Sequence, residues 1–138
     1  CALPIWKQHR IVNIASVAGL RVLPQIGVYC MSKAGVVQMT KAMAVEWGRY
    51  GINVNAICPA TIRPGEGQGS GMVLGLSKEM GMAPEDAFET FSAGGNMAGE
   101  KWRCEMQNIT DAVLFLASSN ADMITGTILP VDCGQMSR

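Results

Sequence analysis

The chain has 138 residues, which is enough for one domain with a buried core and too few for two domains of ordinary size. Lysine plus arginine and aspartate plus glutamate both number 11, so the formal net charge is zero. This balance excludes the basic field that recruits nucleic acid, and no apolar run reaches the roughly 18 residues of a membrane span. We therefore expect a cytoplasmic protein that acts on a small molecule or on another protein, with no nucleic-acid or membrane partner.

The cysteines argue against both a disulfide framework and a metal site. All five are widely spread, none belongs to a C-x-x-C pair, and His9 is the one histidine. A zinc site would need thiolates at closer spacings. The pattern therefore predicts reduced thiols and no metal.

The first half of the chain predicts a strand, a helix and a second strand. Residues 10–15 (RIVNIA) are apolar on both faces, which is typical of a strand inside a parallel sheet. Apolar side chains at helical spacing predict a helix over 29–47. Gly48 and Gly51 follow it and are expected to end it. Residues 52–57 (INVNAI) predict a second strand that Pro59 ends.

Residues 64–107 form the least regular part of the chain. Nine glycines and five methionines gather there, and a helix near 83–91 is the one ordered element that the pattern predicts. An irregular stretch of this length is typical of a functional lid over a substrate site. Four methionines are candidates for lining that site: Met72, Met80, Met82 and Met97.

The last part of the chain predicts a helix and a third strand. Asn108 fits the N-cap of a helix over 109–118, and residues 127–131 (TILPV) predict a strand that prefers the sheet edge because it contains proline. Alternation of strands and helices predicts an α/β fold with a three-stranded parallel sheet and flanking helices. In this sheet the strand 10–15 would pair with only one other strand, although its two apolar faces are typical of a central strand. Residues 1–138 are therefore expected to form a single incomplete domain.

Residues 29–33 read YCMSK, which places Tyr29 and Lys33 one helical turn apart on a shared face. Tyrosine ionises near pH ~10, and an ammonium group about 4 Å away favours the phenolate, which suits general acid/base catalysis near neutral pH. Ser16 follows the first predicted strand, and open α/β sheets bind ligands at the carboxyl ends of strands. Taken singly, each residue also fits a surface pair or a turn, so the surroundings decide.

Three segments in order resemble short-chain dehydrogenase/reductase sequences: RIVNIASVAG, YCMSKAGVVQMTKAMAVEWGRYGINVNAICPA and ITGTILPVDCGQ. The resemblance covers residues 10–138, with 64–107 the least specific part. It implies a partial Rossmann-like α/β fold in which this chain corresponds to the carboxyl-terminal half of the family's domain. It also implies an NAD(P)-dependent oxidoreductase that transfers hydride between nicotinamide and an alcohol or ketone.

The resemblance implies a role for each site residue. Tyr29 would exchange a proton with the substrate oxygen, Lys33 would tune Tyr29 and hydrogen-bond the nicotinamide ribose, and Ser16 would steady the substrate oxygen. The implied cofactor-binding residues are Tyr29, Lys33, Pro59, Ala60 and Ile62. The cofactor is NAD or NADP, and these residues leave that choice open. A homodimer or homotetramer through the helix 29–47 and the C-terminal strand is also implied.

Several positions depart from the family pattern. Ala60 replaces a glycine, Pro64 replaces a common threonine, and residues 132–134 read Asp-Cys-Gly instead of Asp-Gly-Gly. No glycine-rich phosphate turn precedes residue 10, and the glycines of 65–71 follow no strand-to-helix entry of that kind, so the cofactor site is expected to be incomplete. The segment that carries the family's catalytic asparagine is also missing.

Two alternatives therefore stay open. The chain could be an inactive family remnant that serves only as an oligomerisation or binding module. The Tyr–Lys pair could also serve epimerisation or dehydration, as in extended relatives, although the ending VDCGQ disfavours this.

Overall fold

Strands and helices alternate along the part of the chain that the computed structural model describes, residues 9–24, 26–62, 71–92 and 104–137. The elements are β1 (His9–Ile14), α1 (Gly27–Trp47), β2 (Ile52–Pro59), α2 (Gly71–Met80), α3 (Pro84–Ser92), α4 (Met106–Ala117) and β3 (Ile128–Val131). Three 3-10 turns join them: η1 (Val17–Gly19), η2 (Gly48–Tyr50) and η3 (Ser119–Ala121).

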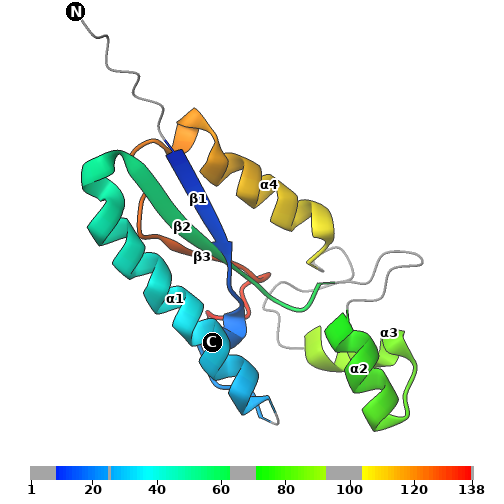
Figure 1. Ribbon diagram of the computed structural model, residues 1–138. Coiled ribbons are helices and arrows are strands. Elements are labelled where there is room, and N and C mark those ends of the chain that lie inside the picture. Colours follow the sequence, from blue (N-terminus) through cyan, green and yellow to red (C-terminus); the bar gives the residue numbers. More distant parts are fainter. Residues whose placement is uncertain (1–8, 25, 63–70, 93–103, 138) are drawn as a thin grey trace, which may run out of the picture.

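The strands form one parallel sheet in the order β1-β2-β3 (Figure 1). β1 pairs with β2 from His9 opposite Ile52 to Ile14 opposite Ile57. The central strand β2 is buried over its last six residues, whereas β1 is partly exposed and has one neighbour among the described residues. The expected α/β fold with a partial three-stranded parallel sheet is confirmed, and β2 is the strand at its centre.

A helix covers each face of this sheet, α1 on one side and α4 on the other (Figure 1). Side chains of β2 alternate between these two layers. Ala56 and Cys58 pack with Val37 of α1, whereas Ile57 packs with Ile109 and Leu116 of α4. This three-layer arrangement leaves the carboxyl ends of β1 and β2 free to line a site.

Helix α1 matches the predicted helix 29–47 at its end and begins two residues earlier, at Gly27. Its buried face includes Thr40, whose hydroxyl accepts a hydrogen bond from Asn13 of β1 at 3.0 Å. Asn13 therefore joins the strand to the helix. No helix in the described part of the chain is both long and apolar enough to cross a membrane.

The region 64–107 holds a pair of packed helices where one was predicted. Helix α3 confirms the helix expected near 83–91, but α2 contradicts the expectation that no other element would form there. Val73 of α2 is buried against Ala87 and Phe88 of α3. The glycines of α2 weaken the local helical signal, and this tertiary packing compensates for them.

Helix α4 begins three residues before the predicted helix 109–118. Glu105 is its N-cap, and Asn108 occupies the third helical position instead of the cap. The Glu105 backbone N–H donates to Asn108 Oδ1 at 2.9 Å, which completes a capping box. The prediction that Asn108 is the N-cap was therefore wrong, because Glu105 occupies the N-cap position. β3 confirms the predicted strand 127–131.

Candidate active site

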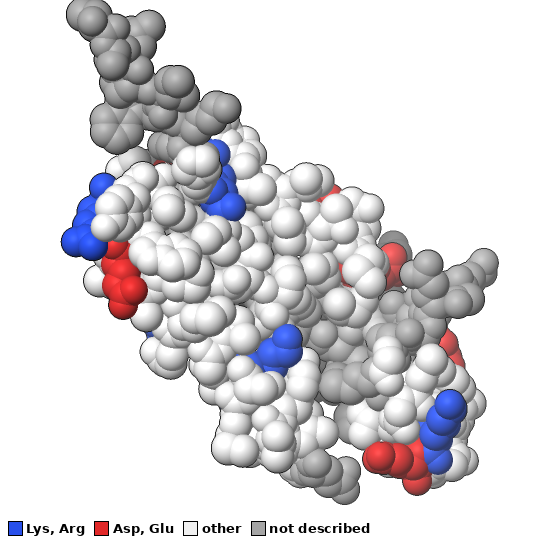
Figure 2. Space-filling model, in the orientation of Figure 1, with Lys and Arg blue, Asp and Glu red and all other residues white. Residues whose placement is uncertain are grey.

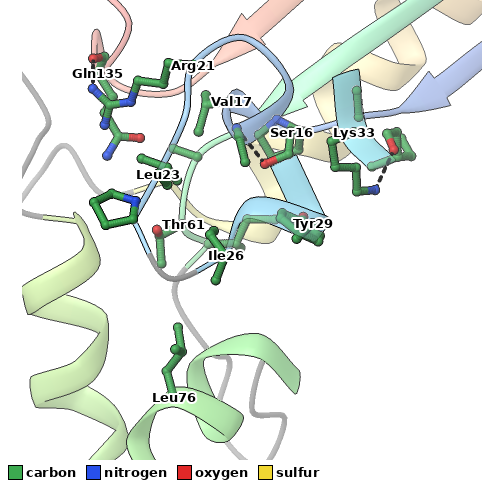
Figure 3. A pocket seen from close by; sticks show the side chains of 17 residues that line it. Ser16, Val17, Arg21, Leu23, Ile26, Tyr29, Lys33, Thr61, Leu76 and Gln135 are labelled. Carbon is green, nitrogen blue, oxygen red and sulfur yellow. Dashed lines mark hydrogen bonds between the residues drawn. The ribbon is translucent and has the colours of Figure 1, made fainter. Parts of the chain in front are cut away.

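A pocket of about 490 Å³ lies where β1 and β2 end (Figure 3). Its walls come from the segment after β1, the loop before α1, the first turns of α1, the segment after β2, α2 and the C-terminal turn. All six residues that the sequence predicts for catalysis or cofactor binding line it: Ser16, Tyr29, Lys33, Pro59, Ala60 and Ile62. The structure thus brings these residues together, and their roles stay predictions.

Ser16 is fixed by the turn that follows β1. It is the N-cap of η1, and its hydroxyl oxygen accepts a hydrogen bond from the Ala18 backbone N–H at 3.1 Å. The residue is 8% exposed and lines the pocket. Because the oxygen serves as an acceptor in this bond, the hydroxyl proton remains available to donate to a ligand.

Tyr29 and Lys33 lie on successive turns at the start of α1, as their spacing predicts. The Lys33 ammonium is 5.7 Å from the centroid of the Tyr29 ring, and it donates to the Ile14 carbonyl at the end of β1 at 3.1 Å (Figure 3). The Tyr29 hydroxyl has no hydrogen bond to a described residue. The pair therefore presents one anchored cation and one available hydroxyl.

Gly19 lets the Ser16 segment approach the helix that carries Lys33. A Cβ atom at Gly19 would lie 2.7 Å from both the carbonyl carbon and the oxygen of Lys33. Only a residue without a side chain fits so close a backbone contact. The sequence alone does not indicate this role, since a loop glycine carries no local sign of its distant partner.

Pro59, Ala60 and Ile62 bring the segment after β2 to the same pocket. The Ala60 backbone N–H donates to the Val131 carbonyl at 3.1 Å, so this segment is tied to β3. These residues share the pocket with Lys33, and their role in cofactor binding stays a prediction. The departure at Pro64 lies outside the described residues.

The cysteines near the site are buried thiols. Cys58 is fully buried, and its burial raises the pKa of its thiol, although the Ser16 backbone and the Lys33 charge oppose that shift. Burial, with the nearby Cys133 and Asp132, raises the pKa of Cys104 to about 11. Neutral thiols are poor nucleophiles. The four described cysteines are free; Cys30, Cys58 and Cys104 are buried and Cys133 is partly buried.

Some lining residues were not anticipated. Arg21, Thr61, Leu76 and Gln135 are the main ones, and they reach the pocket from loops or from the unexpected α2. Of the methionine candidates, Met82 packs against the α2–α3 core, and neither it nor Met80 lines this pocket. The side chains of Met72 and Met97 lie outside the described residues.

Comparison with known proteins identifies the family. A family model described as enoyl-(acyl carrier protein) reductase matches residues 2–136, nearly the whole chain. The chain belongs to the short-chain dehydrogenase/reductase family. Levodione reductase of Leifsonia aquatica is 36% identical over 126 residues, which are 91% of this chain and 44% of that protein. The NAD-dependent glycerol dehydrogenase of Listeria innocua is 37% identical over 125 residues, 91% of this chain and 43% of that protein.

Solved structures of family members agree with the fold. The crystal structure of levodione reductase has a TM-score of 0.76 at 34% identity, over 91% of this chain and 46% of that one. A structure of ElxO with NADP bound has a TM-score of 0.74 at 29% identity, over 94% of this chain and 47% of that one. The chain thus spans less than half the length of these short-chain dehydrogenases/reductases.

Proposed function

We propose that the protein is an NAD(P)-dependent oxidoreductase that transfers hydride between nicotinamide and an alcohol or ketone, with Tyr29 as the general acid/base. The supporting observation is that Ser16, Tyr29 and Lys33 line one pocket with the residues implied for the nicotinamide. The similarity to an NAD-dependent dehydrogenase and to an NADP-bound structure supports a nicotinamide cofactor of either kind.

The cofactor's nicotinamide end would lie against Pro59, Ala60 and Ile62, with its ribose near Lys33. When bound, the nicotinamide accepts or supplies the hydride. The described residues hold the other reactant, because the pocket also offers the Tyr29 and Ser16 hydroxyls. The chain thus contributes the proton-transfer side of the reaction.

The proton moves at the Tyr29 oxygen. In ketone reduction Tyr29 donates its proton to the substrate oxygen, and in alcohol oxidation the ionised Tyr29 oxygen accepts the hydroxyl proton. The Lys33 ammonium, close to the ring and anchored to Ile14, stabilises negative charge on that oxygen. The free Ser16 hydroxyl proton donates to the same substrate oxygen and orients it.

The exchange of Tyr29 for phenylalanine tests this assignment. Tyr29→Phe removes the transferable proton and keeps the ring, so turnover with a panel of secondary alcohols should fall at least about a hundredfold. Turnover is followed by nicotinamide absorbance, and cofactor affinity by nicotinamide fluorescence. Affinity should change little, since the ring and Lys33 remain. Undiminished turnover in Tyr29→Phe would sink the proposed role.

The second candidate is a binding or assembly module without catalysis. Exposed apolar side chains along α1, including Val28, Met31 and Val45, favour it. An absence of NADH and NADPH binding at millimolar concentration, together with intact self-association, would favour this module over the enzyme. Both candidates use the same surface, because we also propose that the protein forms a homodimer or homotetramer through α1 and β3.

A further inference from the structure

We propose that Arg21 and Gln135 bind a carboxylate of the substrate, so that the substrate is a hydroxy acid or keto acid. The inference rests on the proposed function, since it places the substrate in the pocket that Tyr29 lines. Both side chains line this pocket, and in Figure 3 they lie on the side away from Tyr29 and Lys33. The pocket thus has two polar ends.

Arg21 brings a positive charge that no described carboxylate neutralises. The one hydrogen bond that its side chain makes within the described residues runs from Nη1 to the Gln135 carbonyl at 3.4 Å. Its Nε is buried and has no partner there. Nε and Nη2 form the side of the guanidinium that binds a carboxylate through two parallel hydrogen bonds. Since a guanidinium stays charged, this half-buried group favours an anionic ligand.

Gln135 adds a second polar group without a partner. The residue is 6% exposed, and its side-chain oxygen is buried with no hydrogen bond in the described structure. A buried amide left unpaired is costly, so a ligand that pairs with it gains affinity. Rotation of the terminal amide by half a turn places its N–H donors where the oxygen lies, at no cost in existing hydrogen bonds. A carboxylate could then accept from both residues.

The carboxylate that lies nearest to Gln135 in the sequence is engaged by backbone groups. The Asp132 carboxylate, three residues before Gln135, accepts hydrogen bonds from the backbone N–H groups of Gly134 and Met136 at 3.0 and 2.7 Å. Among the described residues, Arg10 and Asp122 form an ion pair near the start of β1. An external anion is therefore the natural partner of Arg21.

The loop that carries Arg21 is held in place. The Arg21 backbone N–H donates to the Val17 carbonyl at 3.1 Å, and the Leu23 backbone N–H donates to the Cys30 sulfur on α1 at 3.4 Å. These ties fix the loop from both the η1 side and the α1 side. A positioned cation loses less entropy on binding than a free surface arginine would.

The wall between the two polar ends is largely apolar, although Thr61 also lies there beside Leu23 and Ile26. Val17, Leu23 and Ile26 lie between the Arg21–Gln135 end and the Tyr29 end in Figure 3. A fitting substrate therefore carries its reacting carbon at one end, a carboxylate at the other, and a hydrocarbon segment between. Straight-chain hydroxy acids have this design.

Binding measurements on acids and their esters test the proposal. We would titrate the purified protein, with and without NADH, with straight-chain hydroxy acids from hydroxybutanoate to hydroxyoctanoate and with their methyl esters. Calorimetry should show one acid of the series binding at least about tenfold more tightly than its ester, as expected for a charged hydrogen-bonded pair. Arg21→Met should abolish that preference, and Arg21→Lys should retain part of it.

Further variants separate this inference from its alternatives. Gln135→Met keeps the backbone carbonyl that Arg21 contacts, and it should weaken acid binding several-fold with an unchanged melting temperature. Tyr29→Phe should keep the acid preference, so binding tests the carboxylate site even if the proposed hydride transfer is wrong. Equal affinity for acids and esters in the unaltered protein, or a preference that persists in folded Arg21→Met, would overturn the inference.

Discussion

Gly19 controls, at the scale of one residue, how close Ser16 lies to the Tyr29–Lys33 helix. A methyl group there would collide with the Lys33 backbone at 2.7 Å, so η1 or α1 must shift in Gly19→Ala. We expect the free energy of unfolding to fall by about 2 kcal/mol, as in other overpacked cores. Turnover should fall by up to about a hundredfold, since small displacements of catalytic groups are costly. Denaturant unfolding and turnover assays measure the two effects.

Gly48→Ala is the matched control for this prediction. It adds the same methyl group at the other end of α1, where nothing lies within 4 Å of the new atom and the backbone is already helical. We expect stability to be unchanged or slightly raised. If the Gly19→Ala protein were as stable and active as Gly48→Ala, the close contact at Gly19 would contribute to neither stability nor turnover.

At this scale, the sequence indicated residues whose proposed roles depend on their own chemistry, and the structure places them around one pocket. Tyr29 and Lys33 are related by local helical spacing, and Ser16 by its place after a strand, so all three could be identified before the fold was known. Gly19 and Arg21 act through contacts with residues far along the chain, at Lys33 and Gln135. Local patterns hold no information on such contacts.

At the scale of the element, one side chain joins β2 to the segment that leads into β3. Asn55 is 1% exposed, donates to the Ile124 carbonyl at 2.8 Å and accepts from the Thr127 backbone N–H at 3.0 Å. Asn55→Ala would take this buried partner away from both backbone groups. We expect it to lower the free energy of unfolding by about 3 kcal/mol, measured by denaturant unfolding.

Asn53 supplies a control on the same strand. Its side chain donates to the carbonyls of Ala121 and Asp122 at 3.3 and 2.8 Å, but it is only partly buried, so water can replace it. Asn53→Ala should therefore cost about 1 kcal/mol. Equal costs for the two alanine variants would show that burial of the Asn55 bonds contributes nothing extra.

The elements were predictable where the local signal matched the tertiary role. The strands and α1 combine β-branched or periodic apolar residues with burial, and their positions agreed within two residues. α2 was missed because Gly71 and Gly75 lower its intrinsic helix propensity, and its stability comes from packing on α3. The α4 start was misplaced since Glu105 caps through a reciprocal bond with Asn108, a less common N-cap than asparagine.

At the scale of the whole molecule, the outer side of α1 carries exposed apolar side chains that no described residue covers. Val28 and Met31 lie one turn apart near the start of α1, Met39 follows in its middle and Val45 near its end, and they are 78%, 68%, 47% and 84% exposed. Figure 2 shows few and scattered charged side chains on the face that includes α1. Single exposed apolar residues are ordinary, but a stripe of them along one helix is typical of an interface.

If α1 pairs with a second copy, charges placed on this stripe should separate the copies. The double variant Met31→Glu with Val45→Glu would bury unpaired carboxylates in the interface, so we expect the dissociation constant to rise at least about tenfold. Sedimentation velocity over a concentration series measures it. Met123→Glu, at a methionine that is 96% exposed and outside α1, should leave the assembly unchanged. An unaltered mass in the double variant would exclude α1 as the interface, whereas the Tyr29 assay would still report on the active site.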